Sequence, residues 1–115
     1  MARADGSGES AELRRLRRRI DALDRRIVRL LNERAELARV VGQAKVAAGR
    51  RAIRDVARER EILLRVTMAN AGPMPQADLL TLYRRLFAST RALEAADRRR
   101  VARAGRIAAE EVGDD

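Results

Sequence analysis

The sequence predicts an all-α protein with three helices per chain, the first of them very long, which pairs with a second copy as an intertwined homodimer. Two observations predict this fold. The composition is rich in Leu, Ala, Arg and Glu with only 2% aromatic residues, which is typical of long helices. Apolar residues also repeat at alternating spacings of three and four. The length of 115 residues is that of one domain.

The first helix is expected over residues 11–48, because its apolar positions keep one helical face through more than four heptads. These positions are Leu13, Leu16, Ile20, Leu23, Ile27, Leu30, Leu37, Val41 and Ala44. At about 1.5 Å per residue the helix is roughly 57 Å long. The rest of so short a chain cannot cover it, which implies a partner subunit.

Two breaks separate three helices. Gly49 is the expected stop of the first helix. A second helix is expected from about Arg54 to Ala71, and the stop and turn signals of residues 70–75 follow it. The third helix is expected from about Pro75 to Ala96 or beyond.

The two ends of the chain differ from the middle in composition. Residues 1–10 are rich in Gly, Ser and Asp and are expected to be a disordered tail, with Ser10 able to cap the first helix. Residues 11–97 are expected to form the helical domain. Residues 98–115 form a charged extension with little apolar pattern, and we expect this extension to fray.

The composition excludes several kinds of chemistry. The chain has no cysteine and no histidine, so disulfides, thiol catalysis, most transition-metal sites and acid–base catalysis by histidine are excluded. No apolar run approaches the roughly 20 residues of a membrane span, and residues 1–12 lack a signal-peptide core. We therefore expect a cytoplasmic protein. The net charge of +9 fits either simple solubility or an anionic partner.

Two cations of the first helix stand out. Arg34 occupies a seam position that should be apolar; it either turns outward to pair with a carboxylate such as Glu33 or Glu36, or meets a bound anion. Lys45 is the only lysine among 26 basic residues. It follows Arg34 by about three whole turns, so both side chains leave one face and could bracket a small dianion. Arg17 is too far along the helix to join them, except from the partner of an antiparallel pair.

Polar residues also form stripes on the later helices. Asp55, Arg58 and Glu59 share one face of the second helix. Thr90 and Glu94 lie one turn apart on the third. Each stripe alone is equally compatible with an ordinary solvated surface.

Four segments in order resemble the all-helical chorismate mutases over about residues 11–96. The segments are Leu16-Arg17-Arg18-Arg19-Ile20-Asp21-Ala22-Leu23-Asp24, then 30–38 with 41–45, then Ile53-Arg54-Asp55-Val56-Ala57-Arg58-Glu59-Arg60, and Tyr83 with Ala88-Ser89-Thr90-Arg91-Ala92-Leu93-Glu94. The resemblance implies a homodimeric enzyme that converts chorismate, a small dianion, into prephenate without a cofactor.

The resemblance also implies roles for particular residues. Arg17, donated across the dimer interface, and Arg34 are expected to bind carboxylates, and Lys45 and Glu94 to face the ether oxygen that gains charge. Asp55, Arg58, Glu59 and Thr90 complete the expected substrate site, with Lys45, Glu94, Arg34 and Glu59 as its catalytic residues. Glu94 must carry a proton to donate to this oxygen, so we expect activity to rise as the pH falls.

The chain departs from the family pattern at three places. Its first turn is one residue longer than in some members, threonine stands at 90 where serine is common, and glutamate stands at 94 where many bacterial members have glutamine.

Three other interpretations remain. The same scaffold also serves 4-amino-4-deoxychorismate mutases and isochorismate pyruvate lyases, although lyase-type relatives usually lack the Asp55, Arg58 and Glu59 set. The arginine clusters at 14–19 and 98–106 fit a non-enzymatic nucleic-acid-binding module, which the near absence of aromatic residues disfavours. A plain coiled coil leaves Arg34 on the seam unexplained.

Overall fold

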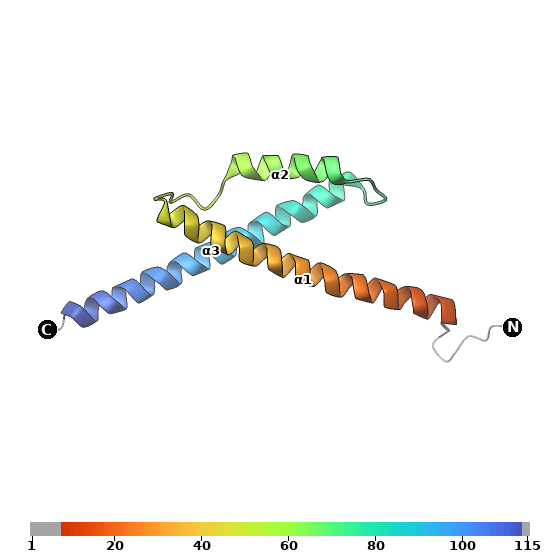
Figure 1. The fold of residues 1–115 in the computed structure, drawn as a ribbon, viewed down its shortest axis with the longest axis horizontal. Helices are drawn as coiled ribbons and strands as arrows, with labels where there is room; N and C mark the ends of the chain where they lie inside the picture. Colours follow the sequence, from red (N-terminus) through yellow and green to blue (C-terminus); the bar gives the residue numbers. More distant parts are fainter. Residues whose placement is uncertain (1–7, 114–115) are drawn as a thin grey trace. The chain divides into compact units, whose positions relative to one another are not determined.

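The computed structural model describes residues 8–113 and consists of three helices (Figure 1). These are α1 (Ala11–Ala47), α2 (Val56–Ala69) and α3 (Gln76–Gly113). No strand occurs among the described residues, so the predicted all-α class with a long first helix is confirmed. Over the same residues, no helix combines the length and the apolar character that crossing a membrane requires.

Helix α1 begins and ends where the sequence predicts. The hydroxyl of Ser10 accepts a hydrogen bond from the backbone N–H of Leu13 at 3.1 Å, which satisfies a donor that the first turn leaves free. At the other end Gly49 has φ +78°, a left-handed conformation that glycine adopts at little cost. The backbone N–H of Arg50 then donates to the carbonyl of Lys45 at 2.8 Å and closes the turn.

Helix α2 starts at Val56 because Asp55 caps it. The backbone of Asp55 is extended (φ −113°, ψ 91°), and its carboxylate accepts the backbone N–H of Arg58 at 3.0 Å. The helix is shorter at both ends than the predicted 54–71. At its start a capping side chain needs an extended backbone, which places Asp55 outside the helix.

Helix α3 begins after Pro75 and continues to Gly113, beyond residue 98 where we expected fraying. The expectation was wrong for residues 98–113, because Ala, Arg and Glu are strong helix formers even without an apolar stripe. Residues 1–7 of the tail predicted for residues 1–10 lie outside the described part of the chain.

The described chain has two parts, residues 8–37 and residues 38–113. In the first part the predicted apolar seam is exposed. The exposed fractions run from 38% at Leu13 to 68% at Leu37. Leu16, Ile20, Leu23, Ile27 and Leu30 lie between these values.

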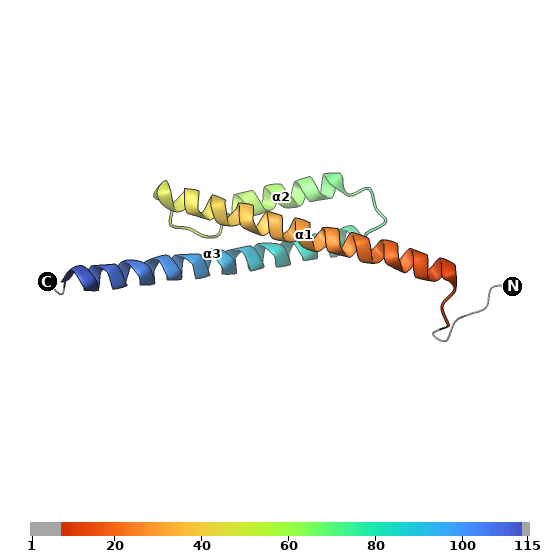
Figure 2. The same cartoon turned by 60° about the horizontal axis from the view of Figure 1, so that its bottom comes forward.

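In residues 38–113, α2 packs along the N-terminal half of α3 (Figures 1 and 2). Phe87 of α3 is 6% exposed and is the buried apolar residue of the described chain. Its ring lies 6.3 Å from that of Tyr83 in an edge-on arrangement that favours aromatic pairs.

A bidentate ion pair ties the end of α1 to α3. The Nε and Nη2 atoms of Arg39 donate to the two carboxylate oxygens of Asp97 at 2.9 and 3.0 Å. Arg100, one turn further along α3, also pairs with Asp97. The hydrogen bonds from Arg39, aided by the positive charges of Arg39 and Arg100, outweigh desolvation and hold the pKa of Asp97 below its ordinary value.

The lowered pKa of Asp97 predicts how stability depends on pH. A carboxyl whose pKa is lower in the folded state stabilises the fold above its ordinary pKa of 3.8, and this contribution is lost as the pH falls through the folded-state pKa. We expect Asp97→Asn to lower the melting temperature at pH 7, and the difference from the wild type to shrink below about pH 4. Melting curves at one protein concentration and several pH values measure this difference.

Asp24→Asn is the matched control, since Asp24 is an exposed aspartate within α1. It should change the melting temperature little at any pH. A difference for Asp97→Asn that stays constant from pH 7 down to the acid range would contradict the assigned role of the ion pair.

Candidate functional site

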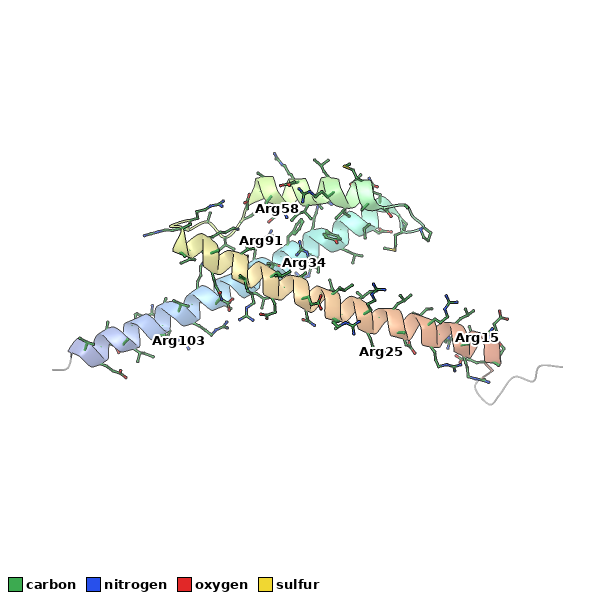
Figure 3. The ribbon with its side chains drawn as sticks, in the orientation of Figure 1. Arg15, Arg25, Arg34, Arg58, Arg91 and Arg103 are labelled. Carbon is green, nitrogen blue, oxygen red and sulfur yellow. The ribbon has the colours of Figure 1, made fainter. Side chains whose placement is uncertain are left out.

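The structure places two of the predicted site residues in residues 8–37. Arg17 is an exposed side chain that pairs with Glu9. Arg34 is half-buried (Figure 3). The other six, from Lys45 to Glu94, lie in residues 38–113.

Glu59 is held on the side of α2 that meets α3. Its carboxylate, 16% exposed, accepts a hydrogen bond from Nη1 of Arg91 at 2.6 Å and lies 3.5 Å from Nε of Arg54. The guanidinium of Arg91 is itself 31% exposed, so this pair is largely shielded from solvent. Removing one partner from such a pair leaves a charge with little water around it, which is costly. Glu59 is therefore fixed in place between two helices.

Asp55 and Arg58 have local roles in this structure. Asp55 caps α2, and its carboxylate lies 3.7 Å from the guanidinium of Arg50. The side chain of Arg58 pairs with Glu61 at 3.2 Å and is 51% exposed (Figure 3). In this conformation Arg58 pairs with its own helix, whereas Glu59 one residue later pairs with α3.

Glu94 is the buried charged residue of the described chain, with an exposed fraction of 7%. It packs against Gly42 of α1, and its Oε2 atom has no hydrogen-bond partner within residues 8–113. A buried polar atom without a partner costs free energy that a bound group could recover. Thr90 lies one turn earlier on α3, half-buried, and its hydroxyl donates to the carbonyl of Leu86 at 3.0 Å.

Lys45 leaves α1 in its last turn, three residues after Gly42, and is half-buried. Three residues correspond to about 4.5 Å along the helix axis. Glu94 lies against Gly42, so the place where Glu94 meets α1 is about one helical turn before Lys45, which lies 49 residues earlier than Glu94 in the sequence (94 − 45).

A cavity of about 660 Å³ adjoins Glu94 on the side of the C-terminal half of α3. Gly42, Arg39, Asp97 and Arg98 are among its lining residues, whereas Lys45, Asp55, Arg58, Glu59 and Thr90 are not. This cavity therefore shares Glu94 with the predicted site without coinciding with it.

Sequence reasoning missed two residues that shape the site. Arg91 pairs with Glu59 across the two helices, and no local pattern marks that pairing. Glu94 packs against Gly42, and this contact could have been predicted from the sequence. A glycine inside a helix of strong helix formers costs stability, so it points to a close contact.

The chemistry of these groups suits binding and positioning of an anion. Guanidinium groups bind carboxylates through paired hydrogen bonds, and an ammonium presents a compact charge. Over residues 8–113, no three acidic side chains gather closely enough to hold a metal ion.

Comparison with known proteins identifies the family. The family model for chorismate mutase type II matches residues 16–95. The chain belongs to this family. The match covers most of the chain and ends just after Glu94, so the extension from residue 96 onward lies beyond it.

Curated relatives and solved structures agree with this assignment. The bifunctional chorismate mutase/prephenate dehydratase of Aquifex aeolicus is 40% identical over 87 residues, which cover 72% of this chain and 24% of that protein. The protein of that name from Stutzerimonas stutzeri is 37% identical over 90 residues, 75% of this chain and 25% of its own length. The chain therefore spans about a quarter of the length of these relatives.

The Form II structure of chorismate mutase from Thermus thermophilus superimposes with a TM-score of 0.69 at 32% identity, covering 73% of this chain and 94% of that one. The predicted resemblance is confirmed.

Proposed function

We propose that this chain is a chorismate mutase, which rearranges chorismate to prephenate. The observation that carries the proposal is the family match over residues 16–95, because this range contains all eight predicted site residues, from Arg17 to Glu94. The Thermus thermophilus chorismate mutase, which is matched over nearly its whole length, consists of the same helical unit.

The reaction is an intramolecular shift in which a C–O bond breaks as a C–C bond forms. It requires neither a nucleophile nor a proton transfer, so catalysis consists of holding the flexible dianion in a compact conformation and stabilising the charge that develops on the ether oxygen. Arg17 and Arg34 bind the two carboxylates through paired hydrogen bonds.

Lys45 and Glu94 act on the ether oxygen. The ammonium of Lys45 supplies a focused positive charge there. Glu94 donates a hydrogen bond from its protonated carboxyl. Its Oε2 atom supports this role, because no protein group within residues 8–113 forms a hydrogen bond with this atom. Glu59 and Asp55 serve the ring hydroxyl, and Arg91 keeps the Glu59 carboxylate in position. Arg58 adds positive potential near these carboxylates, and Thr90 completes the substrate contacts on α3.

We propose that the active form of the protein is a homodimer and that it works in the cytoplasm. The apolar seam of α1 supports the dimer, since side chains from Leu13 to Leu37 are 38% to 68% exposed in the single chain. Exposed apolar stripes of this length are typical of interfaces. The partner contributes Arg17 to each site.

The first prediction concerns activity. Purified wild-type protein should deplete chorismate absorbance and form prephenate, and Arg34→Ala should lose roughly 10²-fold to 10³-fold in kcat/KM because a dianion carboxylate loses its paired donor. Arg25→Ala, an exposed arginine of the same helix, is the control and should retain activity (Figure 3).

The same assay with isochorismate and 4-amino-4-deoxychorismate separates the related activities. If either compound is turned over faster than chorismate, that compound and not chorismate is the substrate. A folded protein that turns over none of the three, and shifts nucleic acid in a salt-sensitive manner, would favour the binding-module interpretation.

The second prediction tests the shared site. Arg17→Ala and Arg34→Ala should each be nearly inactive as pure dimers. Mixed, unfolded together and refolded, they should recover about a quarter of wild-type activity, because half of the dimers combine both chains and one of their two sites then has both arginines. The absence of recovery in a sample shown to contain mixed dimers would place Arg17 and Arg34 in the same chain's site or outside it.

The third prediction concerns the proton on Glu94. Wild-type kcat should rise as the pH falls, because only the protonated carboxyl donates to the ether oxygen. Glu94→Gln should remain active with a flatter profile, since an amide donates at any pH. Profiles of kcat against pH for the two proteins measure this difference. Identical profiles for the two proteins would show that Glu94 does not donate this hydrogen bond.

A further inference from the structure

Gly42 is the buried residue of α1, and the side chain of Glu94 from α3 lies against it. A Cβ atom built on Gly42 would lie 3.1 Å from Cγ of Glu94, 3.2 Å from its Cδ and 3.5 Å from its Oε2. The first two distances are shorter than ordinary van der Waals contacts. A methyl group at residue 42 would therefore force the Glu94 carboxyl to shift.

The backbone conformation does not explain this glycine. Gly42 lies within a regular helix, where alanine is preferred over glycine by about 1 kcal/mol. Gly105 of α3 provides a comparison within the same chain, because a Cβ on Gly105 would meet no atom within 4 Å. What sets Gly42 apart is the side chain that fills the space beside it.

The position of Glu94 depends on this packing. Its carboxyl is buried, and Oε2 has no hydrogen-bond partner within the described residues that could hold it. Gly42 forms the wall against which the last two carbons of the side chain lie. Lys45, the other group assigned to the ether oxygen, lies one turn further along the same helix.

We propose that Gly42 is a positioning residue that acts through Glu94. Its missing side chain lets the Glu94 carboxyl lie against α1 near Lys45, at the place from which it donates to the substrate. This inference rests on the proposed mutase activity.

The test is Gly42→Ala in the full chain. A shift of about an ångström or less in a catalytic group strongly lowers the rate of the chemical step, so kcat should fall about tenfold or more. KM should stay within about twofold, since the lost interaction is made mainly in the transition state. Gly105→Ala is the matched control, a glycine-to-alanine change in a helix with open space, and should leave both constants unchanged.

A Glu94→Ala background shows whether Gly42 acts through Glu94. Truncating Glu94 empties the space beside residue 42, so adding Gly42→Ala should lower the residual activity no further. An equal loss in both backgrounds would overturn the inference.

Thermal stability gives a readout that does not require activity. Gly105→Ala should raise the melting temperature, as should Gly42→Ala in the Glu94→Ala background, because alanine is the better helix former. Gly42→Ala alone should not raise it. A rise as large as that of Gly105→Ala would show that no close contact exists and would overturn the inference, whatever the enzyme assay gives.

Failure of the proposed function has a different signature. A folded wild type that does not turn over chorismate, or a Glu94→Ala variant as active as the wild type, removes the catalytic role of Glu94 and overturns the positioning role of Gly42 with it. If Glu94→Ala loses activity but Gly42→Ala remains fully active, only the inference about Gly42 is overturned.

Discussion

Burial of apolar surface is the main favourable contribution to folding, and this chain has few places in which to bury it. In the described residues the buried positions are Gly42, Phe87 and Glu94, and only one of them is a large apolar side chain. Helix propensity alone rarely stabilises helices in water, because nucleation is unfavourable and propagation contributes little per residue. The long helices therefore depend on contacts that the described chain does not make within itself, and the proposed dimer supplies them along α1.

Within residues 38–113 three contacts between helices converge on a short stretch of α3. Arg91 meets Glu59 of α2, Glu94 meets Gly42 of α1, and Asp97 meets Arg39 of α1. These three positions are spaced three residues apart and occupy under two turns. The ion pairs of Arg91 with Glu59 and of Arg39 with Asp97 have directional geometry that apolar contacts lack, so they help to orient α2 and the end of α1 against α3. Two of the groups proposed to act on the substrate, Glu59 and Glu94, are positioned by these contacts.

The sequence predicted the elements well and their contacts less well. The spacing of apolar residues and the stop at Gly49 placed α1 within one residue of its observed end, because local periodicity and capping determine helix boundaries. The course of α3 beyond residue 98 was predicted less well, because this part of the helix is rich in Ala, Arg and Glu and lacks the apolar stripe that marks a packed helix. The contact of Arg91 with Glu59 depends on how two helices are rotated about their axes, which one sequence does not determine. The spacing of Arg34 and Lys45 indicated a dianion site, whereas the roles of the individual residues were implied by the family resemblance. The structure adds that Glu94 is buried and that Glu59 is held by Arg91.

The connection between α1 and α2 has a consequence for how such chains vary. Its two ends are fixed by separate backbone contacts, the carbonyl of Lys45 with the N–H of Arg50 and the Asp55 cap with the N–H of Arg58. Between them, Arg51 to Arg54 contribute no helical turn. A residue gained or lost between these contacts removes neither of the two hydrogen bonds. An insertion at this point during evolution leaves Lys45 and Asp55 attached to their own helices, so connections of different length are compatible with the same set of side chains.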